Sequence, residues 1–261
     1  MKKAVSILLL LTFLTIGSLL SQTKRDTTIS GKLHSDETDL ITLTCNLELY
    51  DSVWYLQQNY VLKINNHEFL REVELYDEIP ELYLVDLDVE DNFIEVAVRI
   101  PSFYFLYYDI YRFNGDEIKF LGEIPSIGDV TFWGNNDITA PQYMGFWELT
   151  GDFQLTGDSI SPVVKESYTP ELFWDKEILA TEKITLHVEK NDDSQTTTIE
   201  PGETIEIIKV DIREHCEEEI IQYPFTNSDC SWYYLKSSSG KTGWVRLKNF
   251  MDKVEGLSWA G

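Results

Sequence analysis

The fold of the chain is decided by the stretch WYYLKSSSGKTGWV, residues 232–245. An aromatic-rich segment enters a glycine-containing turn, and a Gly-Trp-Val segment follows at once. Glycine supplies the positive φ angles that tight hairpins require and that other residues resist. We therefore expect an antiparallel hairpin here, which places the last third of the chain among the small β-barrels.

The sequence before this hairpin also has the pattern of short strands. Apolar side chains alternate with polar ones in the stretch that contains Ile41, Leu43, Cys45, Leu47 and Leu49, which is the period of a half-buried strand. Further apolar runs are separated by turn signals such as Asn114-Gly115-Asp116. The sequence predicts an all-β fold.

Composition along the chain divides it into six segments. A basic pair, Lys2 and Lys3, precedes an apolar run and small residues, which is typical of a cleaved signal peptide. A single-pass anchor is the alternative, but the apolar core is short for a membrane span. We expect a signal peptide at 1–21, a flexible leader at 22–39, a β-rich domain at 40–165, a linker at 166–183, a barrel domain at 184–252 and a tail at 253–261.

The C-terminal part resembles a bacterial SH3-like domain. The matching elements are the strand-like run 184–188, the Pro201-Gly202-Glu203 turn, the run 205–210, and the closing Gly240–Val245 motif. The resemblance covers about a quarter of the chain and implies attachment to cell-wall peptidoglycan or to a peptide ligand. The segment 211–231 departs from the family because it is longer and more acidic than the usual turn.

Three aromatic side chains are candidates for the ligand platform of this domain: Trp232, Tyr234 and Trp244. Rigid aromatic rings are common in binding sites. Residues two apart on a strand share a face, so Trp232 and Tyr234 lie together. Alternatively, these rings form the barrel core, which is the favoured place for Trp244.

A second stretch, residues 82–98, resembles the calcium loop of integrin-like propeller repeats of the FG-GAP type. Asp86, Asp88 and Glu90 alternate in an acidic turn between two apolar runs, and Glu95 follows. Calcium requires six to eight oxygen ligands, so the resemblance implies that these four residues bind it. The alternative is an acidic turn without metal. Since about 130 residues are too few for six or seven blades, we expect a propeller-like or open β-sheet domain.

The chain is strongly acidic. It has 21 Lys and Arg against 45 Asp and Glu residues, and loss of Lys2 and Lys3 with the signal peptide leaves 19 against 45, a formal charge of −26. This charge argues against nucleic acid and against anionic lipid surfaces as partners. A cation or a basic partner is compatible with it.

Of the three cysteines, Cys216 and Cys230 are expected to form a disulfide in an oxidising compartment, closing a loop of about 15 residues. Cys45 lies in an alternating apolar run and is expected to be a buried thiol. No cysteine and histidine spacing indicates zinc.

Motifs of catalysis were not found: the four histidines form no metalloprotease array, and there is no nucleophile elbow or phosphate loop. The sequence therefore favours a secreted, non-catalytic bacterial binding protein of the cell envelope, in which the SH3-like domain docks to the cell wall or to a peptide. One alternative is a divergent cell-wall hydrolase with catalytic carboxylates in 40–165. Another is a purely structural envelope protein.

Overall fold

The computed structural model describes residues 22–50, 53–73, 79–102, 105–173, 176–217 and 225–257. The predicted signal peptide, residues 1–21, lies outside these ranges. Within them the regular structure is almost entirely β-strand, and the strand pairs are antiparallel. The prediction of an all-β fold is confirmed.

The first sheet is a four-stranded meander in which each strand pairs with the next along the chain. Its strands are β1 (Gln22–Gly31), β2 (Asp39–Tyr50), β3 (Val53–Ile64) and β4 (His67–Glu72). The predicted alternation in β2 holds, since Ile41, Leu43, Cys45 and Leu47 are all buried. The expected flexible leader is corrected: β1 pairs with β2 from Gln22 to Gly31.

Two further meanders follow in chain order. The second sheet contains β5 (Glu81–Val85), β6 (Glu95–Pro101), β7 (Leu106–Phe113) and β8 (Ile118–Ser126). The third contains β9 (Thr131–Phe132), β10 (Asp137–Tyr143), β11 (Trp147–Thr156) and β12 (Ser159–Val163), with β13 (Glu171–Leu172) paired to β11.

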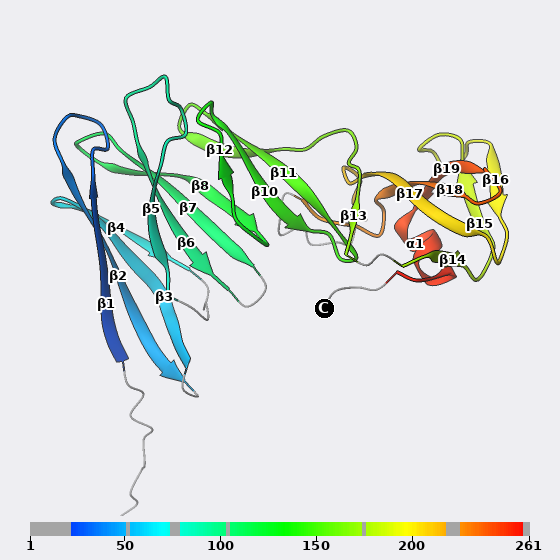
Figure 1. Cartoon of the computed structure of the whole chain (residues 1–261), viewed down its shortest axis with the longest axis horizontal. Coiled ribbons are helices and arrows are strands. Elements are labelled where there is room, and N and C mark those ends of the chain that lie inside the picture. Colours follow the sequence, from blue (N-terminus) through cyan, green and yellow to red (C-terminus); the bar gives the residue numbers. More distant parts are fainter. Residues whose placement is uncertain are drawn as a thin grey trace, which may run out of the picture.

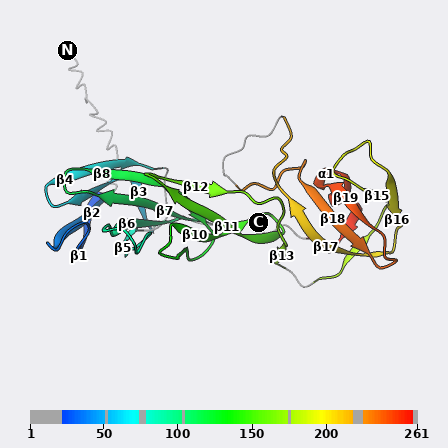
Figure 2. The same ribbon diagram turned by 90° about the horizontal axis from the view of Figure 1, so that it is seen from above.

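The three sheets are stacked, with the second sheet in the middle. One face of the second sheet packs on the first through residues such as Val96, Val98 and Tyr111. Its other face joins the core of the third sheet through Ala97 and Ile110. This position explains why β6 is buried at nearly every residue, because a strand covered on both faces loses the usual alternation of buried and exposed side chains. The stack occupies one end of the molecule (Figures 1 and 2).

The C-terminal part is a strongly curled sheet, a half-barrel, at the other end (Figures 1 and 2). Its strand order is β16-β15-β19-β18-β17-β14-β20. The elements are β14 (Ile178–Ala180), β15 (Ile184–His187), β16 (Thr196–Ile199), β17 (Thr204–Asp211), β18 (Trp232–Ser237), β19 (Thr242–Arg246), α1 (Leu247–Phe250), the 3-10 turn Met251–Lys253 and β20 (Val254–Glu255). The predicted hairpin is β18–β19, with Gly240 at φ +87° in its turn.

The boundaries of the predicted linker and tail are corrected. The expected linker contributes β13 to the third sheet and β14 to the half-barrel, and Tyr168 exchanges backbone hydrogen bonds with Val210. β20, from the expected tail, pairs with β14. One apolar core runs from the third sheet into the half-barrel, where the indole N–H of Trp147 donates to the hydroxyl of Tyr233 at 3.0 Å. The two parts therefore pack as neighbours rather than being held by a free segment.

Candidate ligand-binding face of the C-terminal sheet

The three predicted platform residues lie on one face of the half-barrel. Trp232 and Tyr234 are two apart on β18, and Trp244 on β19 pairs directly with Tyr234. Tyr233, between Trp232 and Tyr234, and Val245, which follows Trp244, point to the opposite face and belong to the core. Alternation along β18 puts Trp232 and Tyr234 on one side, and the pairing of β18 with β19 adds Trp244 to it.

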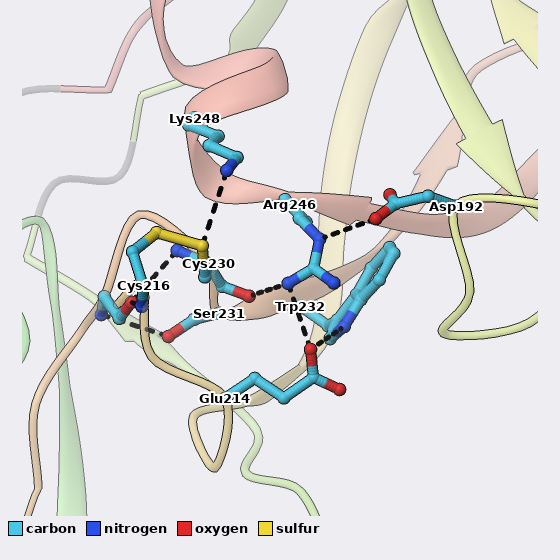
Figure 3. Close-up of a disulfide and its surroundings, with 9 residues drawn as sticks. Asp192, Glu214, Cys216, Cys230, Ser231, Trp232, Arg246 and Lys248 are labelled. Atoms are coloured by element: carbon cyan, nitrogen blue, oxygen red, sulfur yellow. Dashed lines mark hydrogen bonds and ion pairs between the residues drawn. A yellow bond between two sulfur atoms is a disulfide. The ribbon is translucent and has the colours of Figure 1, made fainter. Parts of the chain in front are cut away.

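Trp232 does not form an open platform, because its ring is covered. The side chain is fully buried, and its indole N–H donates to the Glu214 carboxylate at 3.1 Å. The guanidinium carbon of Arg246, the cross-strand neighbour of Trp232, lies 4.2 Å from the ring centroid. Figure 3 shows Arg246 and Glu214 arranged around the indole. Trp232 therefore stabilises the fold here and offers no surface to a ligand.

Arg246 connects three segments that are distant in sequence. Its Nε donates to Asp192 in the loop after β15 at 3.2 Å, and its Nη1 lies 3.0 Å from Glu214. The same Nη1 donates to the backbone carbonyl of Cys230 at 2.9 Å. These bonds, drawn in Figure 3, hold the Arg246 guanidinium in place over the Trp232 ring.

The segment that carries Glu214 is pinned by the predicted disulfide. Cys216 and Cys230 lie at disulfide distance, with their Cα atoms 5.3 Å apart. Cys45 is a free, buried thiol, and burial raises its pKa to about 12 although Arg25 opposes the shift. Lys248 of α1 lies 3.4 Å from the Cys230 sulfur (Figure 3). The pairing therefore fixes the loop after β17 against the face that contains Trp232.

The least covered ring of the face is Tyr234, which packs on Trp244. Their ring centroids are 5.1 Å apart at 62°, an edge-to-face contact, and Tyr234 is half-buried while Trp244 is 9% exposed. The ammonium of Lys209 lies 5.1 Å from the Trp244 ring and 5.2 Å from the Tyr234 ring, and Lys190 lies 5.2 Å from Trp244. Two cations beside two rings make this patch locally positive in an acidic protein.

Asp211 anchors one of these cations. Its carboxylate accepts hydrogen bonds from Lys190 and from the guanidinium of Arg213, the latter at 2.9 and 2.7 Å. Burial alone would raise the pKa of Asp211, but the hydrogen bonds outweigh it and hold the pKa at about 2. Lys190 is thereby placed beside Trp244 with its charge only partly neutralised.

The sequence pointed to the three aromatic residues but missed the charged residues around them. Arg246 follows Trp244 by two positions, and Lys209 precedes Asp211 by two, so strand alternation alone could have placed both on this face. Lys190, Asp192 and Glu214 come from loops, where no period reveals the direction of a side chain.

The four acidic residues expected to bind calcium have other surroundings. Glu95 is fully buried, where its carboxylate accepts from Arg112 at 2.7 Å and from the Leu87 N–H at 3.1 Å. Asp88 accepts from Asn136 at 2.7 Å and from the backbone N–H of Glu90. Asp86 has one buried carboxylate oxygen with no hydrogen-bond partner.

Within the described ranges, no group of three His, Cys, Asp or Glu side chains is placed to hold a metal ion. The structure therefore does not bring Asp86, Asp88, Glu90 and Glu95 together. Calcium binding stays a prediction, tested by melting wild type and Asp86→Asn/Asp88→Asn in millimolar calcium and in chelator. A midpoint that does not change would identify an ordinary acidic turn.

A buried polar cluster that the sequence did not indicate lies between the first and second sheets. Asp109 is fully buried and accepts from Arg71 at 3.0 Å and from the hydroxyl of Tyr60 at 2.6 Å. Tyr60 also shares a hydrogen bond with Tyr111. Burial, and then the Asp109 charge, raise the pKa of both tyrosines, so they stay neutral and hold the sheets together.

A comparison of the chain with known protein families, with curated proteins and with solved structures finds no match. Across the part of the chain that the structure describes, helices are too short or too polar to cross a bilayer.

Proposed function

We propose that the mature chain is a secreted, non-catalytic bacterial binding protein whose C-terminal half-barrel is an SH3-like domain that docks to peptidoglycan or to a peptide. The observation that carries this proposal is the Tyr234–Trp244 pair with Lys190 and Lys209 beside it. Signal-peptide features at residues 1–21 and the missing catalytic motifs support it from the sequence.

The strand arrangement supports the SH3-like assignment. Three consecutive strands, β17, β18 and β19, form a meander, and the last strand, β20, returns to pair with the first, β14. First-to-last pairing curls a short sheet toward closure, which is the geometry of a small barrel. The disulfide-pinned segment reshapes one side of the face and leaves Tyr234 as its accessible aromatic residue, packed on the largely buried Trp244.

The chemistry of the patch indicates which ligand groups it accepts. Aromatic faces stack on apolar sugar faces and on peptide groups, whereas the ammonium groups of Lys190 and Lys209 attract carboxylates. Peptidoglycan supplies both kinds of group, in its glycan strands and in its carboxylate-bearing stem peptides. An anionic polymer without apolar faces is disfavoured, because the rest of the protein repels it.

The proposal is tested by sedimentation of residues 22–261 with isolated peptidoglycan. Tyr234→Ala and Lys209→Ala should each weaken binding by about three- to tenfold, the equivalent of roughly 0.5–1.5 kcal/mol. Lys63→Ala is the matched control, because the Lys63 side chain is 45% exposed and pairs with Glu68 on the first sheet. Binding that is absent in wild type, or equal in all four proteins, would contradict the proposal. Free stem peptides as competitors distinguish peptide from glycan recognition.

A further inference from the structure

A cleft of about 520 Å³ lies on the second sheet where the third sheet leaves its face uncovered. It is lined by side chains of β5, β6, β7 and the segment leading into β9, namely Tyr83, Leu84, Val85, Ala97, Arg99, Tyr108, Asp129, Val130 and Phe132. Its volume is in the range of small-molecule sites, roughly 300–1,000 Å³. It is separate from the Tyr234–Trp244 face, which belongs to the half-barrel.

Strand register explains why the sheet is hollow here. Tyr83 pairs with Ala97, and Arg99 pairs with Tyr108, so these four side chains occupy adjacent rows of one face. Ala97 is fully buried and has only a methyl group, so it forms a low floor between larger neighbours. Tyr108 makes an edge contact with Phe132 at 6.4 Å, which closes the opposite wall.

The aromatic side chains of this cleft are fixed before a ligand arrives. Tyr83 is 43% exposed, and its hydroxyl donates to Glu81, which also accepts from Arg99 at 2.9 Å. Arg99 hydrogen-bonds the hydroxyl of Tyr108 in turn. Because hydrogen bonds at the hydroxyl groups already fix the orientation of these rings, their side chains lose little conformational entropy when a ligand binds.

The polar groups at the rim have both signs. Glu81 and Arg99 neutralise one another, while Asp129 is exposed and has no ion pair with any described residue. Carboxylates accept hydrogen bonds from hydroxyl groups, and a guanidinium donates to hydroxyl and carbonyl oxygens. An exposed ring face beside such groups suits a ligand that has an apolar face and many hydroxyls. A polyanion is disfavoured by Asp129 and by the net charge of −24.

We propose that the cleft lined by Tyr83, Ala97, Arg99, Tyr108 and Asp129 is a second binding site, and that its ligand is a neutral saccharide. One sugar ring stacks on Tyr83, and its hydroxyls bond with Arg99 and Asp129. This site is independent of the function proposed for the half-barrel, because it uses other residues on another sheet.

The experiment is saturation-transfer NMR on residues 22–261 with four neutral tetrasaccharides built from N-acetylglucosamine, glucose, xylose and mannose. At least one should bind, and Tyr83→Ala should weaken it by about tenfold, because stacking on a ring is worth up to roughly 1.5 kcal/mol. Tyr83→Phe, which keeps the ring, should weaken it less. Lys63→Ala, on the first sheet, is the control and should bind like wild type, and Tyr234→Ala tests whether the saccharide binds at the half-barrel instead.

Three results would overturn the proposal. One is that none of the four saccharides binds at millimolar concentration, and another is that Tyr83→Ala binds as well as wild type. The third is that Tyr234→Ala, and not Tyr83→Ala, abolishes binding, which would assign the saccharide to the half-barrel. If Tyr83→Ala has a lowered melting midpoint, Asp129→Asn replaces it, since Asp129 is exposed and its loss leaves the core intact.

Discussion

Removing the disulfide should destabilise the half-barrel by an amount that can be estimated from the loop it closes. The cysteines are 14 positions apart, and closing a loop of about 15 residues contributes roughly 3 kcal/mol through the entropy of the unfolded chain. Cys216→Ser/Cys230→Ser also loosens Glu214 from Arg246. That pair is half-exposed at Glu214, so it adds at most about 1 kcal/mol.

The assay is thermal unfolding of oxidised wild type, reduced wild type and the double serine variant. For a chain of this size 1 kcal/mol shifts the midpoint by about 2–4 °C, so both perturbed samples should melt roughly 6–12 °C below oxidised wild type. Mass spectrometry without reduction should find the Cys216 and Cys230 peptides linked, and Cys45 alkylated only after unfolding. Equal midpoints, or a cross-link that contains Cys45, would refute the reasoning.

Three further predictions concern single side chains. Arg246→Ala should uncover Trp232, lower the free energy of unfolding by about 1–3 kcal/mol and shift tryptophan emission to the red, and Arg246→Lys should have a smaller effect. Unchanged emission would show that Arg246 does not shield Trp232 from water. The pKa of Asp211 is lowered, so its contribution to stability is complete above the unfolded pKa near 4 and is lost as the pH falls toward 2. In Asp211→Asn the urea midpoint should therefore fall less between pH 4 and pH 2 than in wild type. An equal fall in both proteins would contradict the assignment. Asp109→Ala should lower the free energy of unfolding by about 1–3 kcal/mol, because Arg71 and the Tyr60 hydroxyl lose a buried acceptor while Arg71 keeps Glu123. In urea unfolding the exposed control Glu68→Ala should stay within about 0.5 kcal/mol of wild type, and similar values for both variants would argue against the buried pair.

Strand periodicity predicted much of the fold. The inward positions of β2 and the hairpin β18–β19 follow from the alternation and from Gly240. The sequence predicts a flexible leader here because β1 has few apolar residues; among its described side chains, Ile29 is the one apolar group that packs partly on the core. β13 and β14 have two and three residues, which are too few to show an alternating pattern. The sequence therefore predicts a linker at 166–183 where the structure has two short strands.

The candidate site was predictable only where strands determine it. Alternation predicts that Trp232 and Tyr234 share a face, but the place of Trp244 depends on strand pairing and the burial of Trp232 on Glu214 from a loop. The acidic turn illustrates the same limit. Glu95 was expected to face an ion, yet its partner is Arg112, 17 residues away on a neighbouring strand. Long-range pairings of charged side chains leave no local signal in the sequence.

The most direct test of the proposed function is hydroxyl-radical footprinting of residues 22–261 with and without soluble peptidoglycan fragments. The account predicts that oxidation of Tyr234 falls when the fragments bind, while the covered Trp232 is scarcely oxidised in either state. Saturating fragments that leave Tyr234 as reactive as before would contradict the account.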